Sequence, residues 1–365
     1  MSPASASSTS QKPRVLFVPV SGPHGSGELM RCLIIARELR RAEPGIDSHF
    51  LVSRNAVFRE AVDFPVHDCD DSPTRSTPQV LATLAALRPR VVVFDNAGRT
   101  EQLRAARRGG ARLVFTSRSP RLRWKAFRVT WLRLLDEHWI VFPKFVTGGL
   151  SLVERAKLWF AQDYRVRHLD TLFTPSQPRE REAWLAAQGL SEGQYTLFVP
   201  GGRAEQQPNG LDPAELFVDA ASRYAGETRA TAVVLTGRVA ADTPAATAAS
   251  LRLLPRVRPE EVQHLLAAAA RVVSNGGTSL IHALAHGKEI VTVPLAADQA
   301  RRIRRAARLG VVIAAKPLPE DIARAVTALA RDPERGAIMR RRVAALRLVN
   351  GVDEAVAALR RLAMT

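Results

Sequence analysis

The residues with the clearest chemical potential form a short run in the last third of the chain, from Ser274 to Ser279. An apolar segment that reads as a buried strand ends at Ser274, and a helical pattern begins near Thr278. Gly276 and Gly277 would allow a tight turn and the close approach of a ligand. Because a helix N-terminus offers free N–H groups and a positive dipole end, this pattern predicts a diphosphate site. Further hydrogen-bonding groups come from Ser274, Asn275, Thr278 and Ser279.

A second glycine-rich turn follows the first predicted strand and ends at Gly27. Glu28 opens the next helix and could take a proton from a hydroxyl or a water, or it could simply favour the helix dipole. His24 is an alternative base, and Asp95, at the end of a buried strand, could assist the base or cap a helix. Arg31 could bind phosphate or form a structural ion pair. The predicted acceptor or phosphate loop consists of Gly25, Ser26, Gly27 and Arg31.

Two other predicted strands in the second half also end in glycine and arginine. Ligands of open parallel sheets bind beyond the carboxyl ends of the strands, where an arginine can pair with phosphate. The alternative is an ordinary solvated arginine. The residues at these two strand ends are Gly201, Gly202 and Arg203, and Gly237 and Arg238.

The run from Ser274 continues as Ala283-Leu-Ala-His-Gly-Lys-Glu-Ile, then Val293-Pro294 and Asp298-Gln299, and as a whole it resembles the donor site of GT-B glycosyltransferases. It is most similar to the lipid II-forming N-acetylglucosaminyltransferase family (family 28 type) and to the nucleotide-sugar hydrolase of the pseudaminic acid pathway. The resemblance implies that the glycines and hydroxyls hold a nucleotide diphosphate, and that the base is uracil. It also implies that Asp298 and Gln299 contact the sugar and that Arg256 and Val257 lie at the base.

One position departs from that family. Where its members have a glutamate that binds the ribose hydroxyls, this chain has His282. A histidine can still hydrogen-bond a hydroxyl, but it is not a bidentate acceptor. The alternative is that His282 and His286 only lie on the helix surface, since two histidines without a third ligand make no metal site.

The N-terminal turn resembles the sequence motif of the hydrolase, Gly-x-Gly-His-x-x-Arg-Cys-Leu, with Glu28 in place of the histidine. Three functions remain open. The first is a metal-independent transferase that uses a UDP-linked sugar and a lipid- or membrane-associated acceptor in bacterial cell-envelope or polysaccharide synthesis. The second is a nucleotide-sugar hydrolase, and the third is a non-catalytic binding protein. No cofactor or metal is expected, because no acidic pair of the DxD type stands at the end of a strand predicted from the sequence.

Apolar strands alternate with helical patterns along the whole chain, which predicts an α/β protein with parallel sheets. With the resemblance, this gives two Rossmann-like domains facing each other across a cleft. The expected division is a disordered tail over 1–12, an acceptor domain over 13–175 and a donor domain over 176–340. A C-terminal helix over 341–365 is expected to pack back on the N-terminal domain.

The net charge of +18 is concentrated between Arg99 and Arg133, where eleven basic residues accompany one acid. Apolar and aromatic residues are interleaved there, so this face could lie on an anionic membrane, attract an acidic substrate or be an ordinary solvated surface. Within it, residues 118 to 133 are expected to form a basic loop on the acceptor domain. Binding to nucleic acid would rest on charge alone. The protein is expected in the cytoplasm or on the inner face of the membrane, since no apolar run is long enough to span a bilayer. The expected membrane-facing residues are Arg121, Arg123, Trp124, Lys125 and Arg128.

Overall fold

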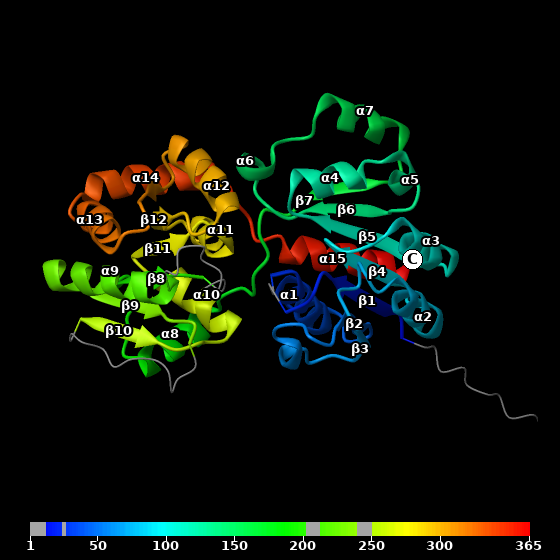
Figure 1. Ribbon diagram of the computed structural model, residues 1–365, viewed down its shortest axis with the longest axis horizontal. Coiled ribbons are helices and arrows are strands. Elements are labelled where there is room, and N and C mark those ends of the chain that lie inside the picture. Colours follow the sequence, from blue (N-terminus) through cyan, green and yellow to red (C-terminus); the bar gives the residue numbers. More distant parts are fainter. Residues whose placement is uncertain (1–11, 24–26, 202–211, 239–249) are drawn as a thin grey trace, which may run out of the picture. The chain divides into compact units, whose positions relative to one another are not determined.

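Figure 1 shows the computed structural model, which describes residues 12–23, 27–201, 212–238 and 250–365. The chain divides into two compact units. The first unit runs to Val141 and also includes Leu150–Leu169 and Gly351–Thr365, while the second contains Phe142–Gly149 and Asp170–Asn350. The boundary between the domains was expected at 175/176. In the structure, the main part of the first unit ends at Leu169 instead, and residues 142–149 belong to the second unit. Of the expected tail, only Lys12 lies within the described residues.

The first unit is built on a seven-stranded parallel sheet in the order β3-β2-β1-β4-β5-β6-β7. Its central strands β1, β4 and β5 are mostly apolar and buried, as expected where helices cover both faces of a parallel sheet, whereas the outer strands β3 and β7 are more polar. The strands are β1 Arg14–Pro19, β2 Asp47–Ser53, β3 Val66–Cys69, β4 Val91–Asp95, β5 Arg112–Ser117, β6 Glu137–Ile140 and β7 Arg165–His168.

Helices cover the two faces of this sheet unequally. On one face α2 to α5 bury Leu16, Phe94 and Phe115, with Trp131 edge-on to Phe115. The C-terminal helix α15 packs against α1, and Arg360 of α15 pairs with Glu43 at 3.1 Å. The helices of the first unit are α1 Gly27–Ala42, α2 Thr77–Leu87, α3 Thr100–Arg108, α4 Pro120–Ala126, α5 Val129–Leu132, α7 Leu152–Phe160, α15 Val352–Met364 and the short 3-10 helix Arg59–Ala61.

The second unit contains a six-stranded parallel sheet in the order β10-β9-β8-β11-β12-β13. Its hydrophobic core forms where side chains on both faces of β8 and β11 pack against helices that include α9, α11 and α13. The strands are β8 Tyr195–Val199, β9 Thr231–Leu235, β10 Leu251–Leu254, β11 Arg271–Asn275, β12 Glu289–Val293 and β13 Ile313–Ala314.

In the second unit, helix α9 begins where the sequence provides a cap. At α9, the Asp212 side chain accepts a hydrogen bond of 2.7 Å from the N–H of Ala214, and Pro213 occupies the first position, as predicted. The helices are α6 Lys144–Thr147, α8 Pro178–Ala187, α9 Pro213–Thr228, α10 Pro259–Ala268, α11 Thr278–Ala285, α12 Ala297–Arg308, α13 Pro319–Ala330 and α14 Pro333–Ala345.

Candidate functional site

Each sheet has one point at which the strand order reverses. In the first unit it lies between β1 and β4, and in the second between β8 and β11. In open parallel sheets generally, ligands bind in the crevice at the carboxyl ends of the strands beside such a point. Glu28 and Asp95 lie at the reversal point of the first unit, and Gly201 and the Ser274–Ser279 run lie at that of the second.

The turn after β11 is fixed by side chains that bind its backbone. The side-chain oxygen of Asn275 accepts from the N–H of Gly277 at 2.9 Å. The side-chain oxygen of Gln299 accepts from the N–H of Gly276 at 3.1 Å and from that of Leu295 at 3.0 Å. Both side chains are buried, so they support the turn from inside the unit. Asn275 and Gln299 therefore position the site rather than reach into it.

Gly276 is required for packing. A Cβ at this position would lie 2.8 Å from atoms of both Gln299 and Ile303 on α12. The sequence analysis assigned Gly276 to the approach of a ligand, but the structure uses its missing side chain to let α12 close on the turn. Gly201 has a similar place at the end of β8: its φ is +88°, and a Cβ there would meet the Asn275 amide at 2.3 Å.

Helix α11 starts at the turn without a side-chain cap. Its first residue, Thr278, is exposed, and Ser279 is half-buried. The first N–H groups of a helix have no partner within that helix, so α11 offers donors and a positive dipole end at the strand terminus. Ser274 is fully buried in β11, and within the described residues its hydroxyl has no hydrogen-bond partner. The groups available to an anion are therefore the backbone of α11, Thr278 and Ser279.

Arg302 is a residue that the sequence analysis missed. It lies on α12, one turn after Asp298, and its guanidinium binds the carbonyl oxygen of Gly276. It also lies 3.5 Å from the carboxylate of Asp298 and 4.9 Å from the ring centroid of Phe142. Asp298 itself is exposed. A cation beside this turn would add to its attraction for an anion. The one sequence signal was its spacing of four residues from Asp298.

His282 does not occupy the predicted place. Its Nδ1 accepts from the side-chain amide of Gln263 at 3.0 Å, and the oxygen of the same amide accepts from His286 Nε2 at 3.1 Å. The two rings also lie against Phe173, with centroids 5.1 and 4.9 Å from it. Burial lowers the pKa of His282 to about 3, with a contribution from His286, so the ring is neutral. These contacts favour a packing role for His282 over an exposed helix surface; its Nε2 has no hydrogen-bond partner within the described residues, and the ribose contact stays a prediction.

The remaining strand ends contribute little beyond structure. Gly237 has a φ of +71°, and Arg238 pairs with Asp212 and, at 3.2 Å, with Glu215. The N–H of Arg256 binds the carbonyl of Arg238 at 2.7 Å, and Val257 packs against the core of the second unit. These contacts favour the structural interpretation of Arg238. The predicted residues Gly202 and Arg203 lie outside the described residues, as do His24, Gly25 and Ser26 of the first unit.

At the reversal point of the first unit, Glu28 is mostly buried and surrounded by donors. Its carboxylate accepts from the amide of Asn96 at 2.7 Å and pairs with Arg118 at 3.0 Å. Burial raises the pKa of Glu28, but attraction by Arg31 and Arg118 and the Asn96 hydrogen bond outweigh it, so the pKa lies below its usual value. The group is therefore ionised at neutral pH and ready to accept a proton, although a lowered pKa makes it a weaker base.

Asp95 lies beneath this carboxylate and is fully buried. Its two oxygens bind Arg31 at 2.7 and 2.8 Å, and it also accepts from the hydroxyl of Thr116 and lies 3.6 Å from the sulfur of Cys32. This geometry supports the structural ion pair for Arg31. Because Asp95 has no free surface, it can act on a substrate only indirectly, by holding Arg31 next to Glu28.

The basic segment from residue 118 to 133 is not a loop: it contains α4 and α5. Arg123 is buried, with its guanidinium paired at 2.6 Å to Glu154, so it cannot face a membrane. Lys125 is half-buried, donates to the carbonyl of Gly98 at 2.7 Å and lies over the ring of Trp131. Arg121, Trp124 and Arg128 are exposed, and Arg128 lies over the Trp124 ring.

Neither metal ligands nor a membrane span emerge from the described ranges. They hold no cluster of three or more His, Cys, Asp or Glu side chains suited to a metal ion. Among the helices in those ranges, none combines the length and the apolar character needed to cross a bilayer.

No family model matches the chain, and no curated protein matches it. Solved structures do. The glycosyltransferase of kitacinnamycin is 17% identical, with 96% of this chain and 99% of that one covered and a TM-score of 0.64. The spinosyn forosaminyltransferase SpnP is 16% identical, with 97% of this chain and 100% of that one covered and a TM-score of 0.65. UGT2 of Phytolacca americana, solved with UDP-2fluoro-glucose and pterostilbene, is 14% identical, with 97% of this chain and 99% of that one covered and a TM-score of 0.64.

These likenesses extend over nearly the whole chain, but at such low identity they establish the fold alone. The chain has the two-sheet α/β fold of GT-B glycosyltransferases. The predicted fold class is thereby confirmed. The closer resemblance to family 28 and to the hydrolase stays a prediction.

Proposed function

We propose that this protein is a glycosyltransferase that takes its sugar from a nucleotide diphosphate, bound by the second unit at the turn between β11 and α11. The observation that carries the proposal is the uncapped N-terminus of α11, held open by Asn275 and Gln299 at the point where the strand order reverses. Backbone donors and Arg302 would stabilise the negative charge on the leaving diphosphate, which is electrostatic catalysis without a metal ion.

The first unit would supply the acid–base chemistry. Glu28 would accept the proton of the acceptor hydroxyl, with Asn96 and Arg118 fixing the carboxylate. If water took the place of the acceptor, the same site would hydrolyse the nucleotide sugar. The hydrolase-like motif from Gly25 to Leu33 favours hydrolysis as the second candidate function. We further propose, from the resemblance, that the base is uracil.

For the acceptor, we propose a lipid-linked molecule of cell-envelope polysaccharide synthesis at the inner face of the membrane. The support is the excess of basic residues between Arg99 and Arg133, of which Arg121 and Arg128 are exposed. An anionic, membrane-borne acceptor would be attracted to such a surface.

The experiment is isothermal titration of the protein with a panel of nucleoside diphosphates and their sugars, followed by an assay for release of free nucleotide from the sugar that binds. Binding of one diphosphate, weakened in Thr278→Val, supports the donor site and identifies the base. Release that depends on an added acceptor supports the transferase, and equal release in buffer alone supports the hydrolase. If no member of the panel binds, the proposal fails.

A further inference from the structure

Helix α7 of the first unit turns its large apolar side chains to solvent. Leu152, Val153, Trp159 and Phe160 are 81%, 64%, 74% and 80% exposed, and we call these four residues the α7 ridge. A surface helix usually has the reverse arrangement, with its apolar stripe towards the core. A gathering of exposed apolar side chains of this size marks an interaction site.

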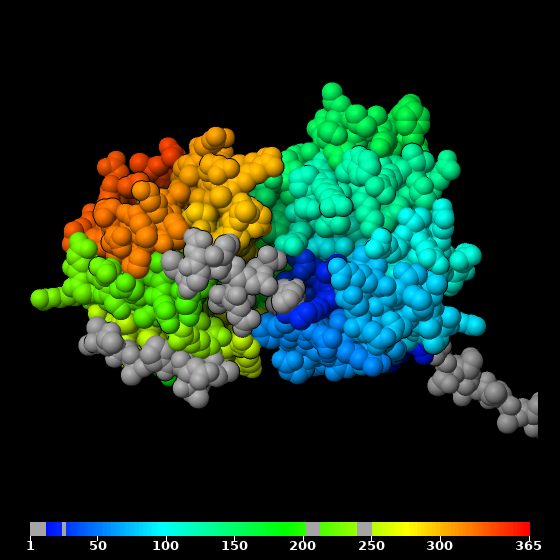
Figure 2. Space-filling model, viewed as in Figure 1, coloured from blue at the N-terminus to red at the C-terminus, as the bar shows by residue number. Residues whose placement is uncertain are grey.

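The inward face of α7 combines Leu158, which packs against the core of the first unit, with polar side chains that are tightly held. The guanidinium of the buried Arg123 binds both oxygens of the half-buried Glu154, at 2.8 and 2.6 Å. The ammonium of Lys157 donates to the carbonyl of Phe127 at 2.9 Å, and Ser151 caps the first turn at 3.2 Å. These contacts fix α7 on α4, so the outward direction of the α7 ridge is built into the structure. Figure 2 shows α7, in green, as the uppermost part of its unit.

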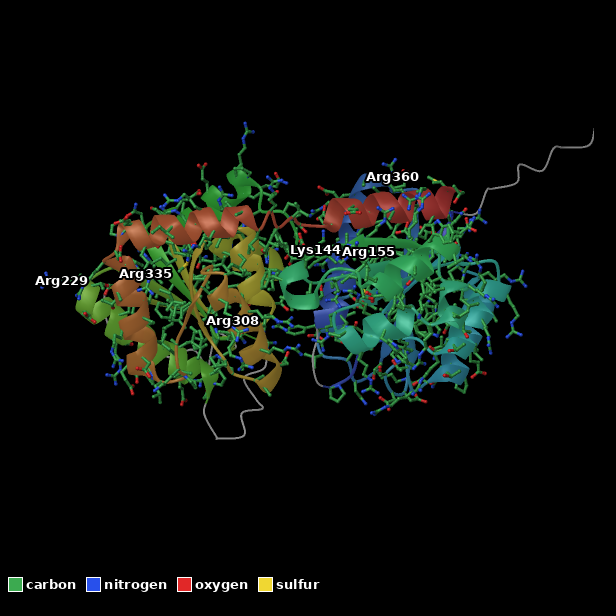
Figure 3. All side chains as sticks on the ribbon, turned by 90° about the horizontal axis from the view of Figure 1, so that it is seen from above. Lys144, Arg155, Arg229, Arg308, Arg335 and Arg360 are labelled. Carbon is green, nitrogen blue, oxygen red and sulfur yellow. The ribbon has the colours of Figure 1, made fainter. Side chains whose placement is uncertain are left out.

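The surface around the α7 ridge is basic. Figure 3 looks onto this side of the molecule and labels Arg155, which is exposed on α7 between the two apolar pairs of the ridge. Phe160 and Val129 of α5 line the same surface hollow, which continues the apolar area onto α5. Beyond the Arg123–Glu154 pair, residues 128–133 and 150–165 carry five basic side chains and one acid. They are Arg128, Arg133, Arg155, Lys157 and Arg165, and Asp163.

We propose that the α7 ridge docks on an anionic lipid bilayer, with its aromatic and aliphatic side chains in the headgroup region and the surrounding arginines on the lipid phosphates. Tryptophan and phenylalanine beside exposed cations are the side chains that stabilise a helix in this interface. The ring centroids of Trp159 and Phe160 are 4.8 Å apart, so the two side chains form a single block for insertion. A symmetric contact with a second copy is disfavoured, because it would bring the same arginines together.

This docking goes beyond the proposed glycosyl transfer and does not depend on it. It deepens the proposal only in that a lipid-borne acceptor would then be presented to the first unit. It also moves the main membrane contact from the segment that the sequence suggested, residues 121 to 128, to a helix that the sequence analysis did not single out.

The test is flotation of the full chain with vesicles of phosphatidylcholine alone and of phosphatidylcholine mixed with phosphatidylglycerol. The wild type should float with the mixed vesicles and much less with the neutral ones. The double variant Trp159→Ser/Phe160→Ser should lower the partition coefficient on mixed vesicles by about tenfold or more, because both side chains lose apolar burial. The matched control is Leu309→Ser/Leu318→Ser, which removes two exposed apolar side chains, 43% and 42% exposed, from the second unit and should float like the wild type.

Equal flotation of the ridge variant and the wild type would overturn the proposal, as would a wild type that binds neither vesicle. A wild-type dimer by light scattering that the ridge variant converts to a monomer, without vesicle binding, would assign the α7 ridge to a second copy instead. Nucleotide titration of the same samples keeps the two proposals apart. Loss of flotation with intact nucleotide binding concerns the α7 ridge alone, and absent nucleotide binding with intact flotation concerns the donor site alone.

Discussion

The two strand-order reversal points differ in the kind of polar group they present. In the first unit the point is crowded with paired charges: Glu28 lies among Arg31, Arg118 and Asn96, over the buried Asp95. In the second unit it is formed by backbone N–H groups and the neutral side chains Asn275, Gln299 and Thr278, with Arg302 as the cation that binds the turn. The sheets share an architecture, but their crevices differ in polar character: the first has paired charges, and the second has neutral donors with one cation.

This difference indicates a division of labour. Neutral donors around a helix N-terminus suit a ligand that brings its own negative charge, since no carboxylate of the turn itself repels it. A carboxylate held by cations suits the transfer of a proton. Each crevice would perform badly at the task of the other. We therefore expect substitutions in the first unit to change turnover and those in the second to change nucleotide affinity.

The largest effect is expected for Glu28→Gln. The amide keeps the shape and can still bond Asn96 and lie beside Arg118, but it cannot take a proton. Turnover of the nucleotide sugar should fall by roughly 10²–10⁴, the usual contribution of a general base, with nucleotide affinity unchanged. Steady-state release of nucleotide and titration calorimetry measure the two quantities. A fall in affinity with unchanged turnover would reverse the assignment of the two crevices.

Arg302→Gln should act on the other crevice. It removes a cation that binds the Gly276 carbonyl, so the turn loosens and the diphosphate loses a favourable charge. We expect a loss of affinity of about tenfold, in the range of one charge-assisted contact. Arg301→Gln, an exposed neighbour on the same helix, is the matched control and should leave the dissociation constant unchanged. Equal losses in both variants would mean that only overall charge matters.

Arg118→Gln tests how the first crevice sets the acidity of Glu28. The Arg118 guanidinium is one of the groups that hold the pKa of this carboxyl below its usual value, so removing it should raise that pKa. Turnover is lost as pH falls and Glu28 becomes protonated, so the acid limb of the pH profile should move to higher pH. An unmoved limb would show that Glu28 is not the titrating base.

The smallest effect on binding is expected for His282→Gln, because His282 packs against Gln263 and Phe173 rather than facing the turn. Nucleotide affinity should be unchanged. Stability should respond to pH instead: the pKa of about 3 lies below that of an unfolded histidine, near 6.5, so the stability contribution of neutral His282 is complete above pH 6.5 and is lost as the pH falls towards 3. Urea unfolding across this range should show a shallower acid loss in the variant. A large loss of affinity at neutral pH would restore the ribose contact.

Much of the fold could be predicted from local pattern. Continuous apolar runs such as Val91–Asp95 and Arg271–Asn275, each followed by a turn and a helical pattern, are enough to predict parallel α/β sheets. The helix start at Asp212-Pro213 could also be predicted, since a cap is a local signal. The short strands β3, β7, β10 and β13 were missed, because two to four residues give no periodicity to detect.

The sequence predicted where the residues of the candidate site lie more successfully than what each of them does. Ser274 to Ser279 do lie at a strand end and a helix start, but Gly276 is needed for packing against Ile303, a contact between segments remote in sequence. The burial of Arg123 and of His282 likewise depends on Glu154 and Gln263, which no spacing rule connects to them. The same ion pair turns α7 outwards, so its unusual surface could be seen only in the structure.

The most direct test of the central claim is titration calorimetry of Thr278→Asp with the nucleoside diphosphate that binds the wild type. An aspartate in the first turn of α11 suits the helix dipole, so the melting temperature should be maintained or raised. The same carboxylate would stand where the diphosphate is expected, and affinity should fall by about a hundredfold or more through repulsion and lost donors. A folded variant with lost affinity would support the donor site at this helix. A folded variant that binds the nucleotide like the wild type would contradict it.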